Sequence, residues 1–176
     1  MSTKKLKNYS GLYGELGADA SPFYVYSELI EDRSGLFNWT IGTLGGGGTF
    51  NPQAGLSLNG TGAITLNGAT LNNPLGQTAT DSGAHTFVLA NGAIFNNTGT
   101  FLAQNNNGLL FGVGTGTTFN NNGTFTRNTG TGAYTINGGI AFNNSGTVNA
   151  DSGTLAFNGS YTQTAGTLDL EGGTVS

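Results

Sequence analysis

Few side chains in this 176-residue sequence could take part in acid–base, metal or nucleophilic chemistry. The chain has no cysteine and a single histidine, His85, which excludes thiolate metal sites and leaves one imidazole for acid–base work. Charged residues make up 8% of the sequence and the net charge is −4. Nucleic-acid surfaces need clustered positive charge, which this composition lacks. We therefore expect no catalytic residue, no cofactor, no metal site and no nucleic-acid partner.

Carboxylates are the remaining candidates for catalysis. Residues 42–176 contain five charged side chains: Asp81, Arg127, Asp151, Asp169 and Glu171. Arg127 and Asp151 follow two equivalent sequence phrases by eight and nine residues, so we expect them to be neighbours on a surface. Asp169 and Glu171 alternate and would share a face. Glycoside hydrolysis requires paired carboxyl groups, whereas a mixed exposed pair usually contributes ~0–1 kcal/mol as an ion pair. A carbohydrate-active protein is therefore an alternative to a non-enzymatic one.

These side chains are set in a repeating sequence. The phrase Phe-Asn-Asn-x-Gly-Thr begins at Phe95, Phe119 and Phe142, at intervals of 24 and 23 residues, and Leu71 begins a related phrase 24 residues earlier. Repeats of this length indicate stacked units, because one unit cannot bury its own apolar side. Continuing the register to residues 50 and 161 gives six anchors. The sequence predicts an all-β, parallel β-solenoid of about six coils, on the order of 30 Å long.

A second phrase predicts strands that end in turns. Apolar and polar residues alternate before Asn-Gly at 64–68, 134–138 and 155–159, with a longer variant at 87–92. Alternation indicates a strand with one buried face, and Asn-Gly tolerates positive φ in a turn. The same pattern is also typical of a β-hairpin, so an antiparallel meander or sandwich is the alternative fold. Like phrases about 23 residues apart favour the solenoid.

Equivalent residues of successive coils would lie about 4.8 Å apart, so that identical side chains form ladders. The predicted ladders are one apolar column and two asparagine columns: Leu71, Phe95, Phe119 and Phe142; Asn72, Asn96, Asn120 and Asn143; and Asn73, Asn97, Asn121 and Asn144.

Thr-x-Thr pairs on a flat solenoid face could order water, which makes an ice-binding surface a further alternative. The pairs begin at Thr78, Thr124 and Thr162. Their offsets from the anchor residues differ, so we expect them not to share one plane.

The repeats have a family resemblance. The stretch from Phe142 through Tyr161 to Ser176 contains the phrases Asn-Asn-Ser-Gly-Thr at 143–147 and Ala-Gly-Thr-Leu at 165–168. With them it resembles repeats of filamentous-haemagglutinin-like adhesins and autotransporter passengers, and the resemblance covers roughly residues 48–176. The resemblance implies a right-handed parallel β-helix, secretion, and a role in attachment or in a biofilm matrix. Surface glycans and host or matrix proteins are the partners it implies.

The first 41 residues have a different composition. They hold nine of the fourteen charges, and the glycine run at 45–48 marks a boundary between a segment at 1–41 and a repeat domain at 42–176. Several positions resemble the N-terminal arm of AraC-type regulators: Leu12, Tyr13, Gly14, Glu15, Phe23, Glu28, Ile30, Arg33, Ser34 and 37–41. The cupin strand and helix-turn-helix of that family are missing, so DNA binding is not carried over. The alternatives are a truncated or chimeric regulator-like protein and a simple N-terminal cap.

The cap is expected because an open solenoid end exposes unpaired backbone groups. Phe23, Val25, Leu29, Leu36 and Trp39 could cover the first coil. The C-terminus ends mid-phrase, so we expect either continuation of the rod or end-to-end self-association. No apolar run of the ~20 residues needed to span a bilayer and no recognisable secretory signal is found. We predict a non-enzymatic structural or adhesive module, extracellular or on the cell surface by resemblance, and cytoplasmic if the chain is a chimera or fragment.

Overall fold

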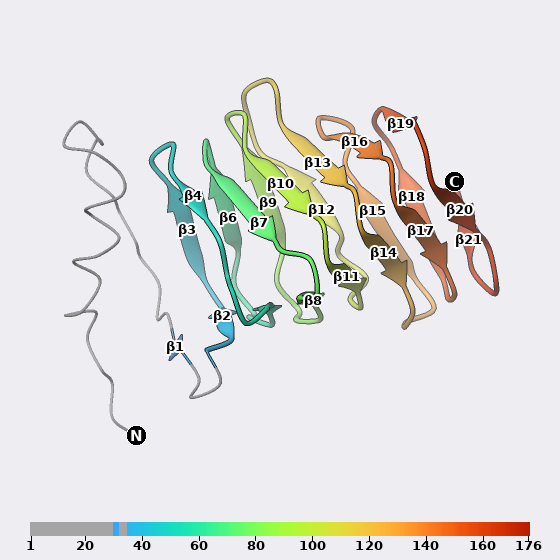
Figure 1. Ribbon diagram of the computed structural model, residues 1–176, viewed down its shortest axis with the longest axis horizontal. Helices are drawn as coiled ribbons and strands as arrows, with labels where there is room; N and C mark the ends of the chain where they lie inside the picture. The colour runs from blue at the N-terminus through green and yellow to red at the C-terminus, as the bar shows by residue number, and fades with distance from the viewer. Residues whose placement is uncertain (1–29, 32–34) are drawn as a thin grey trace.

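The computed structural model describes residues 30–31 and 35–176. The regulator-like positions at 12–28, Arg33 and Ser34, and the cap residues Phe23, Val25 and Leu29 lie outside this range. Within it the protein is all-β and forms a parallel β-solenoid, which confirms the predicted fold class (Figure 1). No described helix is long and apolar enough to cross a membrane.

Three sheets run along the solenoid axis and are called sheets A, B and C below. In spatial order, sheet A contains β1 (Ile30–Glu31), β2 (Phe37–Trp39), β5 (Leu56–Leu58), β8 (Thr78–Asp81), β11 (Thr100–Ala103), β14 (Thr124–Arg127), β17 (Thr147–Ala150) and β20 (Thr167–Asp169). Sheet B contains β3 (Gly42–Gly45), β6 (Ile64–Asn67), β9 (Phe87–Ala90), β12 (Leu109–Phe111), β15 (Ala133–Ile136), β18 (Thr154–Phe157) and β21 (Thr174–Val175). Sheet C contains β4 (Thr49–Phe50), β7 (Thr70–Asn73), β10 (Ile94–Asn97), β13 (Thr118–Asn121), β16 (Ala141–Asn144) and β19 (Tyr161–Gln163).

Each coil takes one strand from sheet B, then one from sheet C, then one from sheet A. Six such coils, from β3 to β20, make up the described solenoid and agree with the six anchors of the sequence. Strands of the same sheet pair in parallel, and β1 with β2 is the one antiparallel pair among the described strands. The hairpin alternative is therefore wrong. The Asn-Gly pairs turn the chain between sheets: Asn91 and Gly92 have φ of 53° and 74° at the corner from sheet B to sheet C.

Aromatic columns fill the interior. Phe95 stacks on Phe119 with ring centroids 4.8 Å apart and planes 4° apart, and Phe119 stacks on Phe142 at 5.1 Å and 7°. Phe101 and Phe125 of sheet A stack at 5.0 Å and meet the first column edge to face. All five rings are fully buried. Parallel in-register strands put identical rings one strand spacing apart, which is why one repeated phenylalanine yields a continuous core.

The N-terminal edge of sheet A is occupied by β1, which pairs with β2. β2 pairs in turn with β5, and Trp39 is fully buried against the first coils. Trp39 packs edge to face on Phe87 with centroids 5.8 Å apart. The described part of residues 1–41 therefore lies against the solenoid.

The threonine register differs from the sequence expectation. Thr78 pairs with Thr100, and Thr100 with Thr124, so the Thr-x-Thr pairs starting at 78 and 124 occupy one column of sheet A. For these two pairs the expected difference in plane is wrong, because the corner at residues 74–77 is longer than the equivalent corners and shifts the count from the anchor; for the third pair the expectation holds. Thr162 lies on sheet C, as part of β19. In the column beside the first, Leu102, Asn149 and Asp169 occupy positions equivalent to Thr80 and Thr126, so the face is not a continuous threonine array.

Candidate functional site

The two asparagines of each repeat point to opposite sides of sheet C. Successive side chains of a strand alternate, so the first asparagine faces outward and the second faces the interior. Asn72, Asn96, Asn120 and Asn143 are half-buried, whereas Asn73, Asn97, Asn121 and Asn144 are buried. We call the first set the outer ladder and the second the inner ladder.

The outer ladder is a chain of side-chain hydrogen bonds running from one coil to the next. The Nδ2 atom of Asn143 donates to Oδ1 of Asn120 at 2.9 Å, Asn120 donates to Asn96 at 2.8 Å, and Asn96 donates to Asn72 at 2.9 Å. Asn72 continues the chain to Asn51. Each donor therefore reaches toward the N-terminal end of the rod.

The inner ladder has the opposite direction. Asn73 donates to Oδ1 of Asn97 at 2.7 Å, Asn97 donates to Asn121 at 2.7 Å, and Asn121 donates to Asn144 at 2.8 Å. The second N–H of each amide bonds a backbone carbonyl of the following coil; the acceptors are Thr100, Thr124 and Thr147. The contacts with these carbonyls fix the direction of the inner ladder. The amide dipoles of the inner ladder are therefore antiparallel to those of the outer ladder. Both donors of Asn73, Asn97 and Asn121 are satisfied, which lowers the cost of burying these amides, while Oδ1 of Asn73 has no hydrogen-bond partner.

An open trough of about 200 Å³ runs beside the outer ladder. It is lined by side chains of four successive coils: Asn96, Asn120, Asn122, Asn143, Ser145 and Thr164. Asn122 and Ser145, at the corner between sheets C and A, are joined by a 2.7 Å hydrogen bond. The trough therefore has amides on one wall, amides and hydroxyls on the other, and no charged group.

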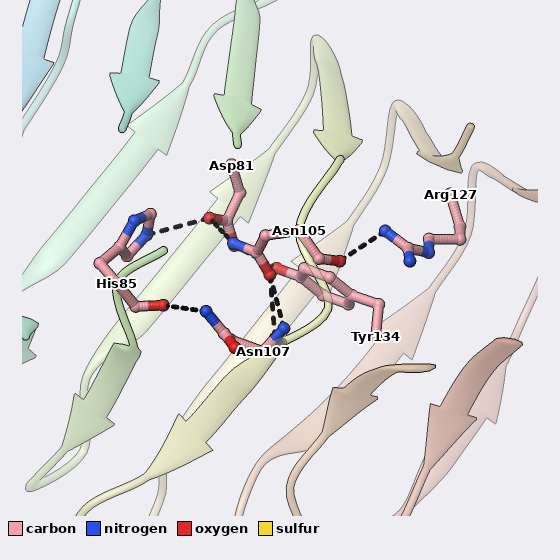
Figure 2. A network of polar contacts seen from close by, with 7 residues as sticks. Asp81, His85, Asn105, Asn107, Arg127 and Tyr134 are labelled. Carbon is pink, nitrogen blue, oxygen red and sulfur yellow. Dashed lines mark hydrogen bonds and ion pairs between the residues drawn. The ribbon is translucent and has the colours of Figure 1, made fainter. Parts of the chain in front are cut away.

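A buried polar network lies at the opposite corner, between sheets A and B (Figure 2). Its centre is Asp81, the last residue of β8. Oδ2 of Asp81 accepts from the hydroxyl of Tyr134 at 2.6 Å, and Oδ1 accepts from Nδ2 of Asn105 at 2.5 Å. Nε2 of His85 lies 2.9 Å from Oδ1, at ion-pair distance though not aligned as a hydrogen bond, and Nδ1 has no partner. Asp81 and His85 flank the corner after β8, Asn105 lies in the corner after β11, and Tyr134 follows the corner after β14, so the network links three successive corners between sheets A and B.

Arg127 forms the far side of this network and is also fully buried. Its guanidinium donates to the backbone carbonyls of Ala103 at 3.0 Å and Asn105 at 2.5 Å, and to the carbonyl of Gly132 at 3.2 Å. It thereby fixes the corner loops of two coils. Desolvation by burial lowers the pKa of Arg127. Burial, together with the Asp81 charge, raises the pKa of Tyr134 well above its usual value.

The expected surface pair of Arg127 and Asp151 is wrong. Arg127 pairs in the sheet with Ala150, so its side chain enters the interior, while Asp151 is exposed. The spacing of eight and nine residues put the two side chains on opposite sides of the strand. Asp169 and Glu171 are exposed on the last coil. Among the residues that the structure describes, no cluster of three or more His, Asp or Glu side chains could hold a metal.

Sequence reasoning missed the buried network. Tyr134 and Asp81 are 53 residues apart and belong to no shared phrase. A usable signal was the 24-residue interval from Asp81 to Asn105, which equals the repeat length and predicts vertical neighbours. Asp81, His85 and Tyr134 are at most 1% exposed, so a solute cannot reach them, and the network acts on the stability of the corner. The outer trough is the site that a ligand could reach.

No protein-family model matches the chain, and no curated protein or solved structure shows significant similarity to it.

Proposed function

We propose that the chain is a non-enzymatic structural or adhesive module of a bacterial surface or secreted protein. In this proposal the stacked core gives a stiff rod, and outward amide and hydroxyl groups make the contacts with surface glycans or with host or matrix proteins. The resemblance of residues 48–176 to adhesin and autotransporter repeats supports this role and a location outside the cell or at its surface.

The observation that carries the proposal is the outer ladder with its trough. Four coils contribute equivalent uncharged polar groups to one face, at the spacing of parallel strands. Many weak contacts repeated along a rod give strong attachment without any single strong contact, because each further contact is intramolecular once the first has formed. The buried network supplies no accessible acid or base for a reaction at this face.

The test is retention of beads coated with the whole chain on immobilised glycans and matrix proteins under flow. We expect retention on at least one class of surface, without release of shortened sugar products. Beads that detach from every surface as fast as uncoated beads would overturn the adhesive role. Release of reducing ends would instead support the carbohydrate-active alternative.

A further inference from the structure

The outer ladder leaves hydrogen-bonding groups available along the trough. A primary amide has two N–H donors and an oxygen with two lone pairs. Asn96 and Asn120 each use one N–H toward the preceding coil and one lone pair toward the following coil. One N–H donor and one oxygen lone pair per coil therefore remain for a ligand. These free groups repeat from coil to coil at about the spacing of the underlying phenylalanines, since the ring centroids of Phe95 and Phe119 are 4.8 Å apart.

The charge of the trough selects against ionic ligands. All six lining residues carry amide or hydroxyl side chains. Phosphate, sulfate and carboxylate groups are bound by Arg, Lys or clustered backbone N–H groups, which supply positive charge. The net charge of the chain, −4, also repels polyanions. A neutral ligand fits this lining.

The spacing of the ladder selects against an extended peptide. A strand rises 3.2–3.4 Å per residue and presents its N–H and C=O groups to one side at every second residue, about 6.7 Å apart. A peptide laid along the axis would leave register with a 4.8 Å ladder within two coils. A sugar polymer carries several hydroxyls on each ring, and each hydroxyl both donates and accepts, so it can meet the ladder at every coil.

We propose that the trough binds a neutral polysaccharide chain lying along the solenoid axis. Its hydroxyl groups exchange hydrogen bonds with Asn96, Asn120 and Asn143 on one wall and with Asn122 and Ser145 on the other. The inference rests on the proposed adhesive function and assigns its ligand class. The lining spans three coil spacings, about 14 Å. Affinity therefore increases with oligosaccharide length until that span is covered and then levels off.

The experiment uses the whole chain in affinity electrophoresis and titration calorimetry with neutral glucan, mannan and galactan, each also as a series of oligosaccharides. Alginate serves as the anionic polymer and a soluble extended peptide as the peptide probe. The test variant is Asn122→Ala with Ser145→Ala, which removes the outer wall and leaves both ladders intact. The matched control is Gln104→Ala with Asn128→Ala, which removes an equivalent exposed hydrogen bond of 3.2 Å between coils outside the trough. Thermal melting by circular dichroism checks that both variants keep the fold.

We expect at least one neutral polysaccharide to bind, the test variant to lose affinity about 10-fold, and the control to stay within about two-fold of the parent. Equal affinities for the test and control variants would overturn the trough as the site. Tighter binding of alginate or of the peptide would overturn the ligand class. Retention of coated beads on matrix proteins without any polysaccharide binding would refute this inference and leave the adhesive proposal standing.

Discussion

The corner between sheets C and A and the corner between sheets A and B solve the same problem in different ways. Both must bury polar side chains where the chain changes direction. The first uses asparagine in four successive coils, and the N–H groups of the inner ladder bond the amides of neighbouring coils and backbone carbonyls. The second uses a single assembly of Asp81, His85, Asn105, Arg127 and Tyr134, which we call the buried network. In the ladder the same asparagine contact is repeated, so substituting one residue leaves the other contacts of the same kind in place. In the network each residue makes a different contact, so the loss of one cannot be replaced by another.

The largest loss of unfolding free energy is expected on substitution of Asp81, the one carboxylate of the buried network. Asp81→Ala leaves the Tyr134 hydroxyl and the Asn105 amide without their acceptor inside the protein, and it removes the carboxylate that lies 2.9 Å from the His85 imidazole. Removing one partner from a buried polar pair costs about 3–5 kcal/mol, and we expect a loss of unfolding free energy in this range. Urea unfolding followed by circular dichroism measures it.

Asp81→Asn serves as the control, because it keeps an oxygen for the Tyr134 hydroxyl and should recover part of the loss. A loss below about 1 kcal/mol for Asp81→Ala would show that water enters this corner and replaces the carboxylate.

The two corners also differ in what the sequence reveals. Phe95, Phe119 and Phe142 recur with their asparagines at a nearly constant interval, and this interval alone predicts the parallel register and the six coils. The strand phrases ending in Asn-Gly predict β6, β9, β15 and β18 because alternation and turn chemistry are local properties. Asp81 and Tyr134 are separated by two coils of the chain, and they meet because the register of those coils brings both side chains to the same corner. No local sequence pattern predicts a contact between residues 53 positions apart.

The register error at Thr78 has a related cause. Counting from the anchor assumes corners of equal length, and the corner at residues 74–77 breaks that assumption. Strand pairing restores the register after the turn, since a one-residue slip would expose the apolar face. Individual corners are therefore the least predictable part of this fold, and the buried network lies at one.

A smaller effect should distinguish the two ladders within the regular corner. Asn121→Ala removes the acceptor for Asn97 and the donor for Asn144, both buried contacts, and the donor for the carbonyl of Thr147, a part-buried contact. We expect a loss of about 2 kcal/mol in urea unfolding. Asn120→Ala is the matched control on the adjacent residue; its half-exposed partners can bond water, so the loss should stay below about 1 kcal/mol. Equal losses would mean that the outer ladder is as important for stability as the inner one.

Alkaline pH should weaken the network corner more than the ladder corner. The pKa of Tyr134 is raised by burial and by the Asp81 charge, so the unfolded chain loses this proton at lower pH than the folded protein does. Above pH ~10 the unfolded state binds fewer protons, and the unfolding free energy falls by up to about 1.4 kcal/mol per pH unit from this group. Below pH ~10 the contribution is fully present.

Urea unfolding of the parent and of Tyr134→Phe between pH 8 and pH 11 measures this effect, and the variant should show a shallower decline. Tyr161→Phe is the control: burial raises the pKa of Tyr161 as well, but this side chain is partly exposed, so its removal should change the decline less. Parallel curves for the parent and Tyr134→Phe would contradict a buried, neutral tyrosine at this position.

The smallest effect is expected at Asp151, which the sequence pairs with Arg127 and the structure separates from it. Because Arg127 donates to backbone carbonyls of the two neighbouring corner loops, its charge is satisfied without any surface carboxylate. Asp151→Ala should therefore change the unfolding free energy by less than about 0.5 kcal/mol, as for other exposed substitutions. The same measurement with added salt should give the same difference, since no exposed ion pair is present to screen. A salt-sensitive loss near 1 kcal/mol would instead support a surface ion pair between Arg127 and Asp151. Arg127 would then lie outside the interior, and the network corner would be less rigidly packed than the ladder corner.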